Sequence, residues 1–217
     1  MTKAVGTHAV RIALGAVTVD GDLHIPARAG GLVVFAHGSG SSRFSRRNRA
    51  VAAALEGAGF GTLLLDLLTP EEEAEDERTT EHRFNIPLLG RRVVGAVEWT
   101  QQRSDLRRLP VAVFGASTGA AAALIAAAAR PAIVGAVISR GGRPDLAEDA
   151  LPRVLSPTLL IVGGDDTPVI EMNRDAMRRM HAHVELAIVP HATHLFEEPG
   201  ALEQVSALAA DWCRRYL

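Results

Sequence analysis

Short apolar runs alternate along the chain with longer helix-like segments. The runs are rich in Val, Leu and Ile, and they end in Gly, Ser, His or Asp; examples are GLVVFAHG, VAVFGAS and TLLIVGGDD. The helix-like segments are residues 46–58, 86–102, 119–129, 145–154, 169–181 and 201–215. Near-continuous apolar strands that alternate with helices are typical of a mostly parallel sheet with helices on both faces. The pattern therefore predicts an α/β fold.

Two segments depart from this alternation. AVRIAL (9–14) and AVTVDGDLHIPA (16–27), with Asp20-Gly21 as a turn signal, predict antiparallel strands at one edge of the sheet. The segment 67–84 is acidic and lacks apolar periodicity, so it is predicted to form a surface loop or a short helix. Whether it covers the active edge of the sheet stays open. No Ser/Gly linker or internal repeat is seen, and we expect residues 1–217 to form a single domain.

Composition and charge narrow the class of protein. Hydrophobic residues make up 47% and charged residues 22% of the 217 positions, as in a soluble globular protein. A net charge of -2 gives no electrostatic footprint for nucleic acid or an anionic membrane. No apolar run has the length of a membrane span, no signal peptide is evident, and the only cysteine, Cys213, rules out an internal disulfide. We expect a cytoplasmic protein; whether it forms a homo-oligomer stays open.

Candidate chemistry begins in VAVFGASTGAAAAL (111–124), where an apolar run meets an alanine-rich run. Gly115-Ala116-Ser117-Thr118-Gly119 matches G-x-S-x-G, the nucleophile elbow. In that motif the serine occupies a sharp turn between strand and helix, and side chains two positions on either side of it would crowd those elements. A phosphate loop would need Gly-Lys-Ser/Thr, and no lysine lies nearby. A dinucleotide fingerprint fails because Arg43 stands where Gly or Ala belongs.

A nucleophilic serine needs a histidine base and a third group that orients the base. Two apolar runs after Ser117 end in the required residue types, because TLLIVGG is followed by two aspartates and VELAIVP by HATH. His191 and His194 both follow the second run, whereas His181 and His183 precede it and should lie at its other end. Metal binding by HAH together with HATH would require both ends of one strand to meet, so we expect no metal site. His37 ends a different strand and is expected to bond its own loop.

The motifs GASTGA, HGSGSS, GGDDTPV and HATHLFEEP together resemble the α/β-hydrolases, and specifically their dienelactone-hydrolase-like branch. The resemblance extends from about Gly31 to the C-terminus. It implies an eight-stranded, mostly parallel sheet with an antiparallel N-terminal edge, and an esterase-type active site without a cofactor. It also implies that Ser117 is the nucleophile, that His194 is the base, and that the backbone N–H groups of Ser39 and Thr118 form the oxyanion hole.

The register of the resemblance selects one of the two adjacent aspartates. In the family pattern the acid lies three residues after the first glycine and three before an apolar residue, and Gly163, Asp166 and Val169 fit that frame. Adjacent side chains on an extended segment point in opposite directions, so Asp165 would face solvent or cap the next helix. One departure matters: dienelactone hydrolases carry cysteine at the elbow, and this chain carries serine. General ester hydrolysis therefore carries over from the resemblance, and lactone specificity does not.

Arginines follow two of the strand ends. Arg43 comes after HGSGSS, and Arg140 and Arg143 come after IVGAVIS. They could bind loop carbonyls or carboxylates such as Asp145; alternatively, Arg43 or Arg140 could anchor an anionic group of the substrate by a bidentate contact. Taken together, the sequence predicts a serine hydrolase that acts on small soluble esters or related acyl compounds. A non-catalytic binding protein with the same fold and an acyltransferase are the alternatives.

Overall fold

A computed structural model describes residues 6–217, and its centre is one eight-stranded sheet. The strands are β1 (Thr7–Leu14), β2 (Val17–His24), β3 (Leu32–Ala36), β4 (Gly61–Leu65), β5 (Val111–Ala116), β6 (Val134–Arg140), β7 (Thr158–Gly163) and β8 (Val184–Val189). Their order in the sheet is β1-β2-β4-β3-β5-β6-β7-β8. β2 pairs antiparallel with β1 at the edge and with β4 on its other side, and the remaining pairs, from β4–β3 to β7–β8, are parallel. The predicted sheet and its antiparallel edge are confirmed.

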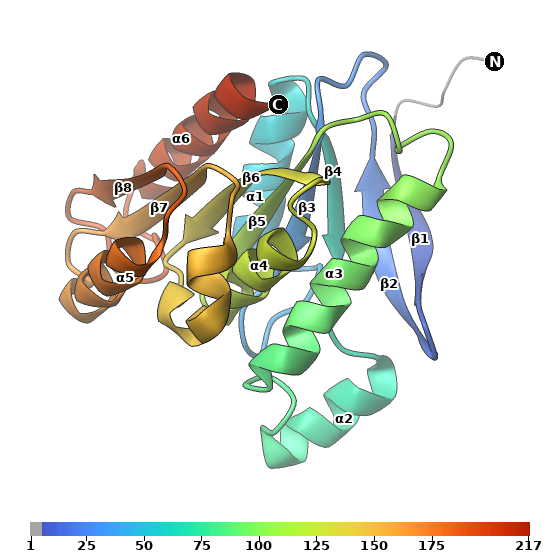
Figure 1. Ribbon diagram of the computed structural model, residues 1–217, viewed down its shortest axis with the longest axis horizontal. Coiled ribbons are helices and arrows are strands. Elements are labelled where there is room, and N and C mark those ends of the chain that lie inside the picture. The colour runs from blue at the N-terminus through green and yellow to red at the C-terminus, as the bar shows by residue number, and fades with distance from the viewer. Residues whose placement is uncertain (1–5) are drawn as a thin grey trace.

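Helices cover both faces of this sheet, as the sequence predicted. They are α1 (Arg46–Gly57), α2 (Pro70–Thr79), α3 (Ile86–Gln102), α4 (Thr118–Ala129), the 3-10 helix η1 (Pro144–Arg153), α5 (Thr167–Arg179) and α6 (Ala201–Tyr216). Figure 1 shows α3 and α4 in front of the sheet and α1 and α6 behind it. Within the described residues no helix is both long and apolar enough to cross a membrane.

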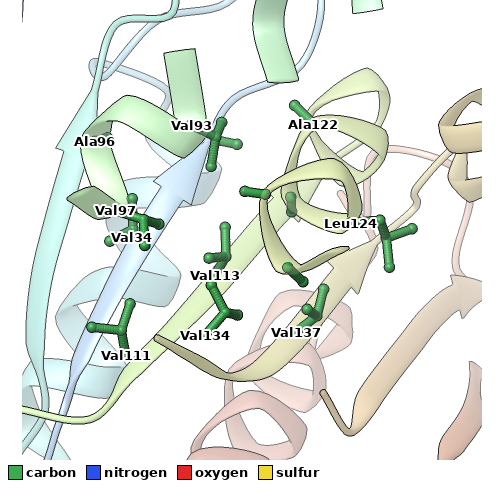
Figure 2. Close-up of a cluster of buried hydrophobic side chains, with 14 of the residues drawn as sticks. Val34, Val93, Ala96, Val97, Val111, Val113, Ala122, Leu124, Val134 and Val137 are labelled. Carbon is green, nitrogen blue, oxygen red and sulfur yellow. The ribbon is translucent and has the colours of Figure 1, made fainter. Parts of the chain in front are cut away.

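Strand side chains alternate between two apolar cores, one on each face. Val33, Phe35 and Phe114 belong to the core under α1 and α6, whereas Val34 and Val113 belong to the core under α3 and α4. Figure 2 shows the second core, where valines from α3 and from the strands meet α4. α4 is nearly all alanine because most of its residues are fully buried, and long side chains would hold its neighbours apart.

The predicted turn at Asp20-Gly21 is wrong. The β1–β2 hairpin turns between Leu14 and Val17, where Gly15 has a φ of +73°. Gly21 instead lies inside β2, and a Cβ on it would come within 3.0 Å of Ile12 Cδ1 and 3.1 Å of the Leu64 carbonyl oxygen. A glycine that permits close packing inside a strand therefore resembled a turn signal.

The acidic segment 67–84 contains a helix, the second of the two alternatives that the sequence left open. Thr69 and Glu72 form a capping box at the start of α2: the Thr69 N–H donates to Glu72 Oε2 at 2.9 Å, and the Glu72 N–H donates to Thr69 Oγ1 at 3.3 Å. In Figure 1, α2 lies at the bottom of the molecule, at the opposite end from the C-terminus.

Candidate active site

Ser117 occupies a sharp turn between β5 and α4. Its φ of +50° and ψ of -121° are sparsely populated for any residue other than glycine, and such a conformation costs about 1–3 kcal/mol. The surrounding backbone holds it: the Ser117 N–H donates to the Arg140 carbonyl at 3.2 Å, and the Arg143 N–H donates to the Ser117 carbonyl at 3.0 Å. The turn is therefore fixed to the end of β6 and the residues that follow it.

The glycines on either side of Ser117 are required by backbone contacts. A Cβ on Gly115 would lie 2.5 Å from Ala120 Cα, and a Cβ on Gly119 would lie 2.3 Å from the Ala36 carbonyl oxygen. Both obstacles are main-chain atoms, so a side chain could not be accommodated by a change of rotamer. These contacts supply the steric reason for the G-x-S-x-G spacing.

His194 and Asp166 come from the neighbouring loops after β8 and β7. His194 Nδ1 and Asp166 Oδ2 are 2.7 Å apart. Because the carboxylate accepts, Nδ1 carries the proton and Nε2 of the neutral ring is left as an acceptor. Of the two adjacent aspartates, Asp166 is thus the one that meets His194, whereas Asp165 is exposed. His191, the other candidate base, is exposed as well.

Close packing of those two loops brings His194 and Asp166 together. The Asp165 N–H donates to the Ala192 carbonyl at 3.0 Å, and a Cβ on Gly163 would lie 2.3 Å from that same carbonyl oxygen. Phe196, just beyond His194, is buried and anchors the loop in the core under α1 and α6. Residues far apart in sequence therefore meet at the carboxyl ends of β7 and β8.

Ser117 and His194 line one cavity of about 240 Å³. The other residues around it are Gly38, Ser39, Ser41, Ser45, Arg47, Asn48, Ala116, Arg140 and Leu195. Among residues 6–217, no hydrogen bond joins the Ser117 hydroxyl to His194. Catalytic hydrogen bonds are often long or poorly aligned in the absence of substrate. The cavity thus brings a serine, an oriented histidine and two arginines to one place.

Ser39 lines this cavity, and Thr118 lies beside Ser39. Their hydroxyl oxygens are 2.9 Å apart, and the Ser39 hydroxyl donates to the Arg83 carbonyl at 3.2 Å. A Cβ on Gly38 would lie 3.1 Å from Ser117 Cβ, so this loop packs directly on the elbow. Within the described part of the chain, the backbone N–H groups of Ser39 and Thr118 have no acceptor. The contact with Arg83 also brings the end of the acidic segment against the loop.

His37 bonds its own surroundings and does not line this cavity. The Leu67 N–H donates to its Nε2 at 3.0 Å, so Nδ1 carries the proton and donates to the Gly38 carbonyl at 2.9 Å. Burial lowers the pKa of His37 below its ordinary value of 6.5. The expectation that His37 bonds its loop is confirmed.

The arginines singled out in the sequence have different surroundings. Arg43 lies outside the cavity, where its guanidinium bonds Asp66 and lies 3.8 Å from both Asp20 and Asp22. Internal carboxylates thus neutralise its charge, and it lies away from the cavity of Ser117, which favours the structural alternative for Arg43. Arg140 is only 7% exposed and lines the cavity. Arg143 pairs with Asp145 at 2.8 Å, as the structural alternative expected.

Two cavity residues escaped the sequence analysis, namely Arg47 and Asn48 in the first turn of α1. They follow HGSGSS closely, but neither stands at a strand end.

The lone cysteine is no rival nucleophile, because burial raises the pKa of Cys213 to about 12. Nor do any three His, Cys, Asp or Glu side chains of residues 6–217 gather into a group that could hold a metal ion.

Comparisons with known proteins agree with this architecture. A sequence profile of the dienelactone hydrolase family matches residues 19–216. The crystal structure of a dienelactone hydrolase from Anabaena variabilis is 57% identical, with a TM-score of 0.96 over 98% of each chain. Est1E from Butyrivibrio proteoclasticus has a TM-score of 0.79 over 95% of this chain and 98% of its own, but at 17% identity it shows the fold alone.

A curated relative from Mycobacterium tuberculosis carries the provisional name of a phosphoribosyl transferase. It is 56% identical over 203 residues, which are 94% of this chain and 45% of that protein. The chain thus spans less than half the length of this relative. Because the family profile covers nearly all of the sequence and the Anabaena structure superposes on almost the whole chain, the protein belongs to the dienelactone hydrolase family of hydrolases.

Proposed function

We propose that this protein is a serine hydrolase that cleaves small carboxylic esters through Ser117, His194 and Asp166. The observation that carries the proposal is the 2.7 Å hydrogen bond between His194 and Asp166, with Ser117 on the same cavity. Asp166 fixes the imidazole tautomer, so that Nε2 can accept a proton. Without such a base, a serine hydroxyl is a weak nucleophile.

The reaction proceeds in two halves. Ser117 Oγ attacks the acyl carbon while His194 Nε2 takes its proton, and the oxyanion of the tetrahedral intermediate accepts hydrogen bonds from the Ser39 and Thr118 N–H groups. One such donor is worth about 3 kcal/mol in comparable sites. The intermediate collapses to an acyl-enzyme, and His194 gives its proton to the departing alcohol. Water then attacks the acyl-enzyme by the same route and releases the carboxylic acid.

The cavity supports a small substrate. Its volume of about 240 Å³ lies below the range of about 300–1,000 Å³ that is typical of sites for drug-sized ligands. Short acyl groups fit such a space, and long fatty-acyl chains do not.

The name of the mycobacterial relative describes a protein of more than twice the matched length. We assign the transferase part of that name to the portion of the relative outside the 203 matched residues, because the corresponding residues of this chain match the hydrolase family profile. A non-catalytic binding protein and an acyltransferase remain the competing functions for this fold.

A fluorophosphonate probe and a panel of p-nitrophenyl esters of increasing chain length test the proposal. The wild-type protein should be labelled at Ser117 and should hydrolyse short esters fastest. Ser117→Ala should fold, since alanine fits the space of serine, but lose both labelling and about 10⁵-fold or more of kcat. Ser41→Ala is the matched control, because it removes another hydroxyl from the same cavity.

Three results would contradict this assignment. Labelling of Ser117→Ala at another serine would move the nucleophile elsewhere, and a wild-type protein that is neither labelled nor active would favour the binding protein. Ester consumption that depends on an added alcohol or amine, with little free acid formed, would favour the acyltransferase.

A further inference from the structure

The guanidinium of Arg140 is buried in the cavity that Ser117 and His194 line. Arg140 ends β6, where it pairs in register with Ala116 of β5, the residue before the elbow. Its carbonyl accepts the Ser117 N–H, so the two residues share one rigid segment of backbone. The backbone that carries this side chain is therefore held against Ser117 by the sheet.

Arg140 has almost no partners inside the protein. Its Nη2 reaches Asn48 Oδ1 at 3.4 Å, which is near the limit of a hydrogen bond, and its Nε and Nη1 are buried without a partner. In the part of the chain that the structure describes, no carboxylate lies within 4.0 Å of its guanidinium. Several N–H groups of the guanidinium therefore have no hydrogen-bond acceptor among the described residues.

The neighbouring charge makes this arrangement less favourable still. Arg47 lines the same cavity, and its own partner, Glu197, is largely exposed at 65%. Burial, together with the charge of Arg47, lowers the pKa of Arg140 to about 10. Arg140 is therefore still protonated at neutral pH, and the cavity holds two positive charges with little compensation.

A packing role alone does not account for Arg140. Its guanidinium carbon lies 6.0 Å from the centre of the Phe196 ring, at the outer limit of a cation–π contact. Such a contact uses the face of the guanidinium and leaves the donors in its plane unpaired. A buried charge without a counter-charge costs several kcal/mol, and a methionine of similar length would fill the same space without that cost.

We propose that Arg140, with Arg47 beside it, binds an anionic oxygen group of the substrate, a carboxylate or a phosphate. The planar guanidinium matches either group in a bidentate contact. The small cavity limits the distance, so the anionic group lies only a few bonds from the ester carbon that Ser117 attacks. The preferred substrate is therefore a short ester with a charged end. This inference rests on the proposed function for the position of the ester.

Matched substrates test the preference. p-Nitrophenyl hemiglutarate carries a terminal carboxylate, and p-nitrophenyl valerate has the same chain length without a charge. The quantity to measure is the ratio of kcat/KM for the charged ester to kcat/KM for the neutral one. We expect this ratio to fall by about 10- to 100-fold in Arg140→Met, since a charge-assisted bidentate contact is lost. Arg140→Lys should restore part of it.

The matched control is Arg174→Met, which removes the same charge from an exposed ion pair with Glu171 on α5. It should leave the ratio unchanged, because the effect belongs to the cavity and not to the net charge of the protein. Equal losses on both esters in Arg140→Met, with the ratio intact, would overturn the inference.

A binding measurement separates this inference from the proposed function. Glutarate and inorganic phosphate are titrated into Ser117→Ala and into Ser117→Ala/Arg140→Met by calorimetry. Binding that requires Arg140 supports the anion site even if the wild-type protein hydrolyses no ester, in which case only the proposed hydrolysis fails. Tighter binding of glutarate identifies a carboxylate substrate, and tighter binding of phosphate identifies a phosphorylated one. If neither anion binds while esters are hydrolysed, the anion site is refuted and the hydrolase stands.

Discussion

Arg43 and Arg140 are both mostly buried, yet their surroundings are opposite. Arg43 is held by the carboxylates of Asp66, Asp20 and Asp22, which come from β2 and from the end of β4. Arg140 has one long hydrogen bond to a neutral amide. We call the first region the aspartate cluster (Asp20, Asp22, Arg43 and Asp66); the second is the cavity with Ser117.

This difference in internal counter-charges is what we expect between a structural region and a ligand-binding one. Buried polar groups in folded proteins are almost always paired, and exceptions need a reason. In the aspartate cluster the chain supplies the counter-charges itself, and only Nε of Arg43 lacks a hydrogen-bond partner. In the cavity Arg140 has no counter-charge among the described residues, two of its nitrogens lack a partner, and Ser117 is held in a strained conformation. Departures from local stability of this kind are expected at functional sites. Substitutions in the cavity should therefore affect activity, and substitutions in the aspartate cluster should affect stability.

The largest effect is expected for the two adjacent aspartates. Asp166→Asn should lower kcat by about 10⁴-fold, because an amide no longer holds the His194 tautomer that leaves Nε2 free to accept. Asp165→Asn should keep most of the activity, since that side chain is exposed. Steady-state kinetics with a short p-nitrophenyl ester, together with a urea unfolding curve for each variant, check this prediction.

The unfolding curves decide whether the comparison holds. Asp166→Asn should unfold at nearly the same urea concentration as the wild-type protein. A large loss of stability together with the loss of kcat would place Asp166 among the structural residues. A 10⁴-fold loss in Asp165→Asn would reverse the assignment of the two aspartates.

The same comparison explains which features the sequence could predict. The strands follow from the apolar runs, and the residues at their ends place an aspartate and a histidine together, because parallel strands bring those ends to one edge of the sheet. The choice of His194 and of Asp166 from their neighbours followed from the family resemblance. The partners of Arg43 were not predictable in this way. Asp20 and Asp22 reach it because β2 pairs antiparallel with β4. The pairing of two strands cannot be read from the pattern of hydrophobic and polar residues within either strand.

Two other features were missed for local reasons. Arg47 and Asn48 reach the cavity from the first turn of α1, and helical residues there usually face solvent or the core. The short helix expected as one alternative in residues 67–84 is present as α2, but its start was not placed, although Thr69 and Glu72 have the spacing of a capping box. Apolar periodicity could not show its extent, because only one residue of α2, Asp76, is buried.

An intermediate effect, of opposite sign in the two regions, is expected for the arginines. Arg43→Met should lower the free energy of unfolding by about 2–3 kcal/mol, because it leaves the carboxylate of Asp66 partly buried without its counter-charge, whereas Asp22 keeps its ion pair with Arg49. Arg140→Met should leave that free energy unchanged or raise it by about 1 kcal/mol, because an unpaired charge is replaced by an apolar side chain. Urea unfolding at pH 7 in a buffer without phosphate or carboxylate measures both.

The buffer matters because a bound anion would stabilise wild-type Arg140 and mask its cost. Arg174→Met is the control for the loss of one positive charge, and its effect should be within about 0.5 kcal/mol. If Arg140→Met destabilised the protein as much as Arg43→Met, the distinction between the two regions would fail.

The smallest effect concerns His37, which lies between the two regions. Its ring bonds the Gly38 carbonyl at the cavity and the N–H of Leu67, the residue after Asp66. Protonation would put a hydrogen on Nε2, where the Leu67 N–H already donates, and burial further disfavours the charged ring. The pKa of His37 is accordingly below 6.5 in the folded protein. As the pH falls through 6.5, the unfolded chain takes up a proton that the folded protein does not, so stability is lost toward acid.

His37→Gln isolates this contribution from the other titrating groups. At pH 7.5 the variant should be less stable than the wild-type protein by about 1–2 kcal/mol, because glutamine cannot reproduce both hydrogen bonds. Below pH 6.5 the wild-type protein alone bears the proton-linked loss, so the difference in unfolding free energy should shrink, by at most about 1.4 kcal/mol per pH unit. Urea curves at half-unit steps from pH 7.5 to pH 5 measure it. If the difference in unfolding free energy between the two proteins stayed constant over this range, His37 would take up its proton equally in the folded and unfolded chains. The hydrogen bonds of its ring would then not disfavour the charged form.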